Sequence, residues 1–176
     1  MLSLARDYLE YTRTCEAEPD LKFLRCIVAD FSVSAEISRV DAEHATEIYR
    51  RLAKERPAVY RADLAEVLVE LGDNMPPSID REDGAKALGE AVGLYCMLTS
   101  EDPATYQGRL LHGLEKLRVA FVELGKAKTI LRSYEEIIRK LMDHFFKNPE
   151  EFGALMETLI RDFQVAAEEA GVEQAS

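Results

Sequence analysis

Apolar residues recur every three to four positions along most of the chain, as in the run that contains Leu64, Val67, Leu68 and Leu71. This spacing places apolar side chains on one face of an α-helix, whereas a strand needs alternation at every second position. No long stretch of the chain alternates in that way. The pattern therefore predicts an all-α protein of about eight helices, the first of them a short one around Tyr8.

Prolines are suited to the first turn of a helix because that position needs no N–H donor. Four of the predicted helices begin with one, at Pro19, Pro57, Pro103 and Pro149. We expect the helix before Pro57 to begin with Asp41 as its N-cap, because a carboxylate there can accept free backbone N–H groups.

Glycines predict two of the helix ends, because glycine accepts the left-handed conformation that follows many helices. We expect Gly72 to end the helix that begins at Pro57, and Gly125 to end the next proline-led helix. Residues 73–78 contain two adjacent prolines and predict a loop. A further helix is expected from Asp80.

A sequence pattern of an aromatic residue, a leucine, a proline and a second aromatic residue recurs at a spacing of 46 residues. Its first copy contains Tyr49 and Tyr60, its second Tyr95 and Tyr106, and the proline recurs a third time at Pro149. Equal spacing of a helix-breaking residue indicates one helical unit stacked on copies of itself.

The residues of this unit carry a family resemblance. Residues 42–60 and their continuation 61–72 resemble tetratricopeptide (TPR) repeats, in the long-period form of bacterial signalling proteins, and 82–95 resembles the second helix of the same unit. The resemblance implies an α-solenoid in which the first helix of each pair lines a concave, partner-binding face. It covers about 42–125 well and 126–165 loosely.

The chain also departs from the family pattern. The loop at 73–80 is longer than the family's tight turn, and the Leu-Gly pair of the next unit lies 53 residues on instead of 46. We therefore expect an irregular array in which the helix from Pro103 is about two turns longer than the helix from Pro57. We expect an N-terminal helical cap in 1–40, TPR-like repeats in 41–167 and a flexible tail in 168–176.

The chain has 176 residues and a formal net charge of −11. Nucleic-acid backbones and anionic membranes attract clustered lysine and arginine, which no segment supplies, so both are disfavoured as partners. Cys15, Cys26 and Cys96 lack metal or redox spacings and indicate core residues in a reducing compartment. No signal-peptide pattern and no apolar run of roughly 20 residues is present, so we expect a cytoplasmic protein.

No arrangement of catalytic or metal-binding residues stands out. Asp41, His44 and Glu47 share one helical face, but a helical metal site needs matching Glu-x-x-His motifs on two helices. A solvated polar face is the simpler interpretation. Because a Gly-rich phosphate loop and a nucleophile elbow are also lacking, we expect neither an enzyme, nor a cofactor, nor a metal.

The sequence thus predicts a non-enzymatic interaction or adaptor module that binds a basic or amphipathic segment of another protein. The candidate binding residues are non-core positions of the helices expected to line the concave face: Arg61, Glu66, Glu70, His112, Glu115 and Arg118.

Two alternatives stay open. One is self-assembly into a homodimer through apolar surface at an unfinished solenoid end. The other is a small-ligand sensor with a pocket between helices, built around Tyr49, Tyr60, Tyr95 and Tyr106.

Overall fold

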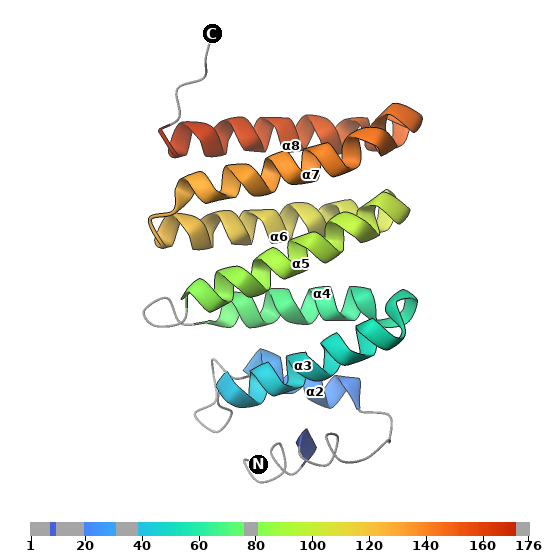
Figure 1. Cartoon of the computed structure of the whole chain (residues 1–176), viewed down its shortest axis with the longest axis vertical. Helices are drawn as coiled ribbons and strands as arrows, with labels where there is room; N and C mark the ends of the chain where they lie inside the picture. Colours follow the sequence, from blue (N-terminus) through green and yellow to red (C-terminus); the bar gives the residue numbers. More distant parts are fainter. Residues whose placement is uncertain (1–7, 10–19, 31–38, 76–80, 172–176) are drawn as a thin grey trace. The chain divides into compact units, whose positions relative to one another are not determined.

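The computed structural model describes residues 8–9, 20–30, 39–75 and 81–171 (Figure 1). Within them the chain forms helices and no strand, which confirms the all-α class. Seven helices are assigned: α2 (Leu21–Asp30), α3 (Arg39–Glu55), α4 (Pro57–Asn74), α5 (Arg81–Glu101), α6 (Pro103–Glu123), α7 (Ala127–Lys147) and α8 (Pro149–Glu169). The sequence predicted about eight. Most of the expected first helix falls outside the described residues.

The chain divides into two compact units, Met1–Ala87 and Leu88–Ser176, and the division falls within α5. In the first unit α3 packs against α2 and α4, and α2 also contacts α4. In the second unit α7 packs against α6 and α8, and α6 also contacts α8. Each unit is therefore a set of helices packed directly on one another.

Each unit is built around the apolar stripes that the sequence pattern predicts. The buried side chains of the first unit include Leu24, Ile27, Val28, Tyr49, Leu64, Val67 and Leu68. Those of the second include Leu110, Leu114, Leu117, Ile130, Tyr134, Leu141, Phe152, Leu155 and Leu159. Burial of one such large apolar side chain stabilises a fold by about 1.5–3 kcal/mol, so these stripes supply the main driving force for helix packing.

The joins α3–α4, α5–α6 and α7–α8 share one backbone geometry. The residue before each proline has φ/ψ angles of −135°/71° at Arg56, −147°/84° at Asp102 and −135°/71° at Asn148. Proline disfavours helical angles in the residue that precedes it, so each helix must stop there. The proline then opens the next helix, as the sequence predicted for Pro57, Pro103 and Pro149.

The predicted helix end at Gly125 is confirmed, whereas the one at Gly72 is wrong. Gly125 follows α6 with a φ of 65°. Gly72, by contrast, is buried inside α4, which continues to Asn74. The Asn74 amide donates to the carbonyl oxygens of Val28 and Ala29 and fixes this last turn on the end of α2. As a result α6 exceeds α4 by three residues (21 against 18), not by about two turns.

The predicted N-cap at Asp41 is also wrong. The chain is already helical at Arg39, so Asp41 lies in the first turn of α3, where it is buried. A carboxylate in that turn still interacts favourably with the positive end of the helix dipole. The side chain of Asp20 does cap α2, because its Oδ1 accepts the N–H groups of Lys22 and Phe23 at 3.0 and 3.2 Å. The expected helix starts at Pro19 and Asp80 lie outside the described residues.

Candidate partner-binding surfaces

The six candidate binding residues fall into two groups of three, one on each unit. Arg61, Glu66 and Glu70 lie on α4 in the first unit, and His112, Glu115 and Arg118 lie on α6 in the second. All six are at least partly exposed, in agreement with their assignment to the surface. Within each group the structure brings two members together in an ion-paired cluster.

The carboxylates of Glu66 and Glu70, one turn apart on α4, converge on Arg25 of α2. The Arg25 Nη1 donates to Glu66 at 3.0 Å, and its Nε and Nη2 donate to one oxygen of Glu70 at 2.9 and 2.6 Å. These hydrogen bonds raise the pKa of the Arg25 guanidinium, which therefore stays charged. We call these three residues the Arg25 cluster.

In the Arg25 cluster the guanidinium offsets part of the negative charge of the two carboxylates, and the cluster stays accessible to solvent. The three side chains stay between one quarter and one half exposed. The second carboxylate oxygen of Glu70 is itself buried and has no hydrogen-bond partner among the described residues. A buried carboxylate oxygen without a donor is costly, so Glu70 carries a desolvation penalty within the first unit.

On α6 the guanidinium of Arg118 binds Glu115 in a two-point contact. Its Nε and Nη2 donate to the two oxygens of Glu115 at 2.8 and 2.7 Å, and its Nη1 donates to Glu169 of α8. Arg118 holds the pKa of the Glu115 carboxyl below its usual range. His112 is exposed one turn before Glu115. We call Glu115, Arg118 and Glu169 the Arg118 cluster.

Exposed apolar side chains lie on the same helix faces as the Arg118 cluster. Val122 is one turn beyond Arg118 on α6, and Val165 is one turn before Glu169 on α8; both are nearly half exposed. Val119, beside Arg118, is exposed as well. This surface of the second unit therefore combines paired charges with apolar contacts.

Sequence reasoning missed Arg25 and Glu169, each of which completes one of the clusters. They lie 45 and 51 residues from their partners Glu70 and Arg118, so the local pattern does not join them. Arg25 did carry a signal, because it is a charged residue directly beside the apolar stripe of α2. The stripe shows that this side of the helix faces its neighbours, where a cation needs a carboxylate.

The four tyrosines of the small-ligand alternative have packing roles in the structure. Tyr49 and Tyr95 are buried, and the Tyr49 hydroxyl donates to the carbonyl oxygen of Leu21 at 2.7 Å. The rings of Tyr60 and Tyr106 lie 5.0 and 6.0 Å from the guanidinium carbons of two nearby arginines, Arg56 and Arg109. The Tyr49 hydroxyl and the rings of Tyr60 and Tyr106 thus have partners within the protein.

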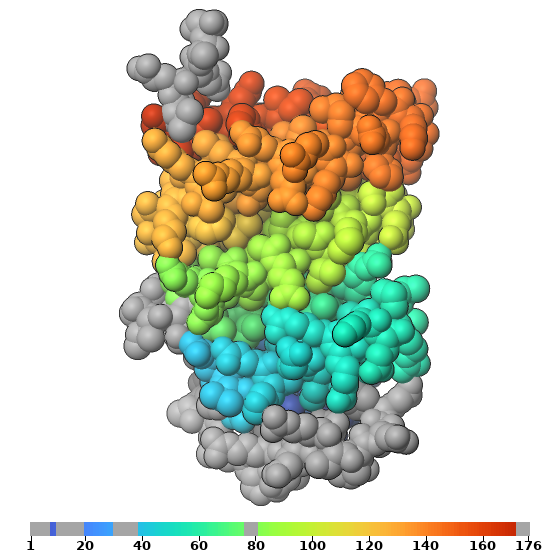
Figure 2. Space-filling view, viewed as in Figure 1, coloured from blue at the N-terminus to red at the C-terminus, as the bar shows by residue number. Residues whose placement is uncertain are grey.

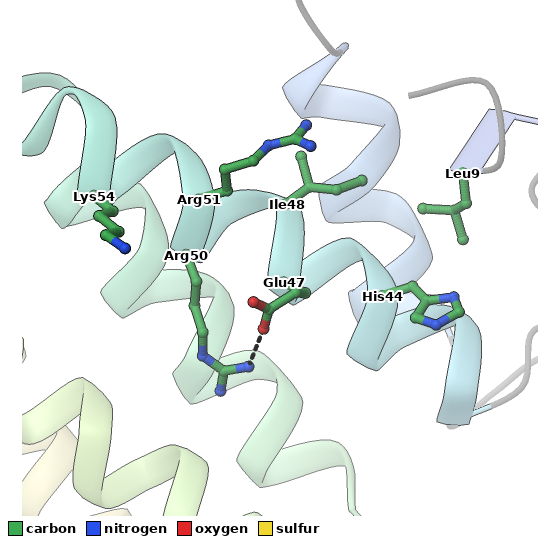
Figure 3. A pocket seen from close by; sticks show the side chains of 7 residues that line it. All are labelled: Leu9, His44, Glu47, Ile48, Arg50, Arg51 and Lys54. Atoms are coloured by element: carbon green, nitrogen blue, oxygen red, sulfur yellow. Dashed lines mark hydrogen bonds and ion pairs between the residues drawn. The ribbon is translucent and has the colours of Figure 1, made fainter. Parts of the chain in front are cut away.

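A pocket of about 440 Å³ lies along α3 (Figure 3). It is lined by Leu9, His44, Glu47, Ile48, Arg50, Arg51 and Lys54. Three of these side chains are cationic and one is a carboxylate, and that carboxylate, Glu47, binds the Arg50 guanidinium at 3.2 Å. Among the described lining residues, cationic side chains thus outnumber carboxylates, although the chain as a whole is acidic.

The described part of the chain contains no group of three or more His, Cys, Asp or Glu side chains placed to hold a metal ion. Asp41 is buried in the first turn of α3, whereas His44 is exposed. Nor does any helix of the described ranges have the length and apolarity needed to cross a bilayer.

We found no matching protein-family model, and no curated protein or solved structure significantly similar to the chain. Its function is therefore inferred from its own residues and geometry.

Proposed function

We propose that the chain is a cytoplasmic, non-enzymatic adaptor of TPR-like helical-repeat type. Its binding surfaces are the exposed faces of α4 and α6, and its ligand is an amphipathic segment of another protein that carries basic side chains. In helical-repeat proteins, polar helix faces that are not used for stacking are available to bind such a segment.

The repeated join supports the helical-repeat part of this proposal. A helix end, a pre-proline residue with the same backbone angles and a proline-led helix recur at Arg56, Asp102 and Asn148, spaced by 46 residues. α5 and α7 have equal lengths and the same spacing, as do α6 and α8. Such units bury their apolar faces by stacking on neighbours and leave polar helix faces available for ligands.

The observation that carries the binding proposal is the mixed surface around the Arg118 cluster. Arg118 lies between carboxylates, and exposed valines extend the same helix faces by one turn, at Val122 on α6 and Val165 on α8. An amphipathic segment could bury its apolar side chains on the valines and place basic side chains at the carboxylates. Burial of the valines would supply affinity, and the charges would supply orientation and specificity.

The Arg25 cluster defines a second contact of the same kind on the first unit. Two carboxylates share one guanidinium, so the cluster keeps a net negative charge. The side chains of Glu66 and Glu70 stay 34% and 25% exposed, so a lysine or arginine of the partner can approach these carboxylates from solvent. Because charge-assisted hydrogen bonds are stronger than neutral ones, these partly exposed carboxylates favour a cationic side chain over a neutral donor.

Capture from the host cell tests this function, with the chain as bait and mass spectrometry as readout. The test variant combines Glu66→Lys, Glu70→Lys and Glu115→Lys, which reverses the charge of both surfaces. The matched control is Glu55→Lys, an exposed carboxylate at the end of α3. We expect partners that the wild type and the control retain and the triple variant loses. If the triple variant captures the same proteins in the same amounts, the proposed surfaces are wrong.

The pocket on α3 supports a second candidate, the binding of a small organic anion. Arg51, Lys54 and Arg50 supply positive charge, and the largely buried Ile48 and Leu9 supply an apolar wall (Figure 3). A ligand with a carboxylate or phosphate group and a short apolar body fits this combination.

Thermal unfolding in the presence of phosphate, citrate and short-chain fatty acids tests the pocket. A bound anion raises the melting temperature, because it stabilises the folded state alone. We expect Lys54→Ala to reduce the shift and Lys128→Ala, an exposed lysine on α7, to leave it unchanged. Equal shifts in both variants would indicate a general salt effect and remove the candidate.

A further inference from the structure

The outward face of the α7–α8 pair carries accessible apolar side chains. A pocket of about 320 Å³ on this face is lined by Glu135, Ile138, Arg139, Met142 and Phe163. Near it, Ile160 of α8 is 45% exposed, and Phe146 at the end of α7 is 72% exposed. In the space-filling view α7 (orange) and α8 (red) form adjoining parts of one surface of the second unit (Figure 2).

The 46-residue repeat shows what the corresponding positions do one unit earlier. α5 and α6 precede α7 and α8 by 46 residues, with equal lengths. The counterparts of Ile138, Met142, Phe145, Ile160 and Phe163 are, in order, Val92, Cys96, Thr99, Leu114 and Leu117. All five counterparts are buried, with 3% or less of the side chain exposed. In the last pair, the same positions are partly or largely exposed.

The earlier positions are buried because neighbouring and later helices cover them. Val92 packs within its own helical pair, since one of its methyl groups lies 3.2 Å from where a Cβ would stand on Gly113 of α6. Burial raises the pKa of the Cys96 thiol, and the charge of Lys140 on α7 is near enough to lower it in part. α6 in turn contacts both α7 and α8. Within the second unit, no helix of the described residues lies against the opposite side of α7 and α8 (Figure 1), so the outward face has the character of a repeat interface.

We propose that this face binds the same face of a second copy of the chain, in a homodimer with twofold symmetry. The inner face of α7, with Ile130, Tyr134 and Ile137, is buried within its own unit and is not free to receive a second copy. Within the described residues of the second unit, the outward face stays uncovered in each copy. Like-to-like pairing also closes the assembly at two chains, whereas head-to-tail stacking would continue into a filament.

The charged side chains beside the pocket are arranged so that two copies of this face can form ion pairs with each other. Glu135 and Arg139 border the apolar side chains from the same helix, one turn apart. Neither side chain forms an ion pair within the part of the chain described. When two α7 helices cross in antiparallel orientation near Ile138, Glu135 of one copy comes close to Arg139 of the partner subunit. Two such contacts offset part of the repulsion between two chains that each carry a net charge of −11.

Sedimentation or light scattering across a concentration series tests the dimer. We expect wild type to dimerise reversibly and Met142→Glu, which places a carboxylate in the apolar face, to raise the dimer dissociation constant at least ~tenfold. Met97→Glu is the matched control, because it makes the same change at an exposed methionine of α5. Wild type that stays monomeric at all concentrations, assembly beyond the dimer, or equal effects of both substitutions would each overturn the proposal.

A charge exchange tests the twofold pairing itself. Glu135→Arg and Arg139→Glu each place like charges opposite one another in their own homodimers, so each variant alone should be monomeric. An equimolar mixture should form a heterodimer, because the introduced arginine of one chain then meets the introduced glutamate of the other, and the second contact is the native pair. A mixture that stays monomeric while wild type dimerises contradicts the pairing. Circular dichroism and melting of each variant verify that both stay folded.

Discussion

Gly125 and Gly171, 46 residues apart, adopt the same left-handed conformation, with φ angles of 65° and 64°. Each follows a helix of 21 residues, α6 or α8, and each donates its N–H to a carbonyl three residues earlier. The two glycines thus mark equivalent ends of α6 and α8, and the prolines mark equivalent starts. The repeat therefore sets both ends of α6 and α8.

Replacement of Gly125 by alanine should destabilise the protein by about 1 kcal/mol. A Cβ there would meet no atom within 4 Å, so the cost comes from the left-handed backbone and not from a clash. The control is Gly108→Ala inside α6, also with open space around the Cβ position, where alanine should stabilise by about 0.5–1 kcal/mol. Urea unfolding measures both. A loss of the same size at both positions would contradict the assignment of strain to Gly125.

Gly84→Ala tests a different role for glycine, the close approach of two helices. A Cβ on Gly84 would lie 2.9 Å from the carbonyl oxygen of Gly72 and 3.0 Å from Cβ of Met75. Because the nearest atom is backbone, α4 or α5 must shift, and we expect a loss of about 1–3 kcal/mol. Gly89→Ala, further along α5 with nothing within 4 Å, is the control and should be neutral or stabilising. Unchanged stability in Gly84→Ala would show that the helices are free to adjust.

Gly72 also shows where the sequence was informative and where it was not. The apolar period and the proline spacing predicted the helices and their joins, because both signals are local. A glycine near the end of an apolar run can end a helix or admit a neighbouring one, and sequence alone favours the first. The structure gives Gly72 the second role, since α4 continues to Asn74 and the start of α5 packs close to this glycine.

The candidate surfaces were predictable to a similar extent. Four candidate residues were expected on the surface because they lie off the apolar stripes, and all four are at least partly exposed: Glu66, Glu70, Glu115 and Arg118. Their pairing with Arg25 and Glu169 depends on how distant segments pack, which helical periodicity does not specify. The sequence could not predict the exposure of the outward face of α7 and α8 for a related reason. Phe163 and Leu117 have the same apolar pattern, and only the packing shows which of them is covered.

Arg25→Met should destabilise the first unit by about 1 kcal/mol in low salt. Methionine keeps an apolar chain of similar length, but Glu66 and Glu70 lose their common cation and repel one another one turn apart. The loss should shrink in 1 M NaCl, because both carboxylates are partly exposed and salt screens their repulsion. Arg161→Met on α8, where the arginine makes only a 3.8 Å contact with Asp162, is the control. Equal losses at low and high salt would show that the effect comes from packing instead of charge.

Tyr134→Phe should change the dependence of stability on alkaline pH. Burial, with the nearby carboxylates of Asp162 and Glu115, raises the pKa of Tyr134 to about 12, against 10.0 for an unperturbed tyrosine. Between pH 10 and 12 the unfolded chain therefore loses this proton while the folded chain keeps it, and stability falls as the pH rises. This loss of stability is absent well below pH 10, where the hydroxyl is neutral in both the folded and the unfolded chain. Near pH 11 it amounts to about 1 kcal/mol.

Phenylalanine has no proton to lose, so the difference in unfolding free energy between Tyr134→Phe and wild type should move by this amount in favour of the variant from pH 9 to pH 11. Comparing the two proteins removes the contribution of all other groups that titrate in this range. A difference for Tyr134→Phe that stays constant from pH 9 to pH 11 would mean that the hydroxyl titrates alike in the folded and unfolded chains, against the burial that the packing of α7 requires.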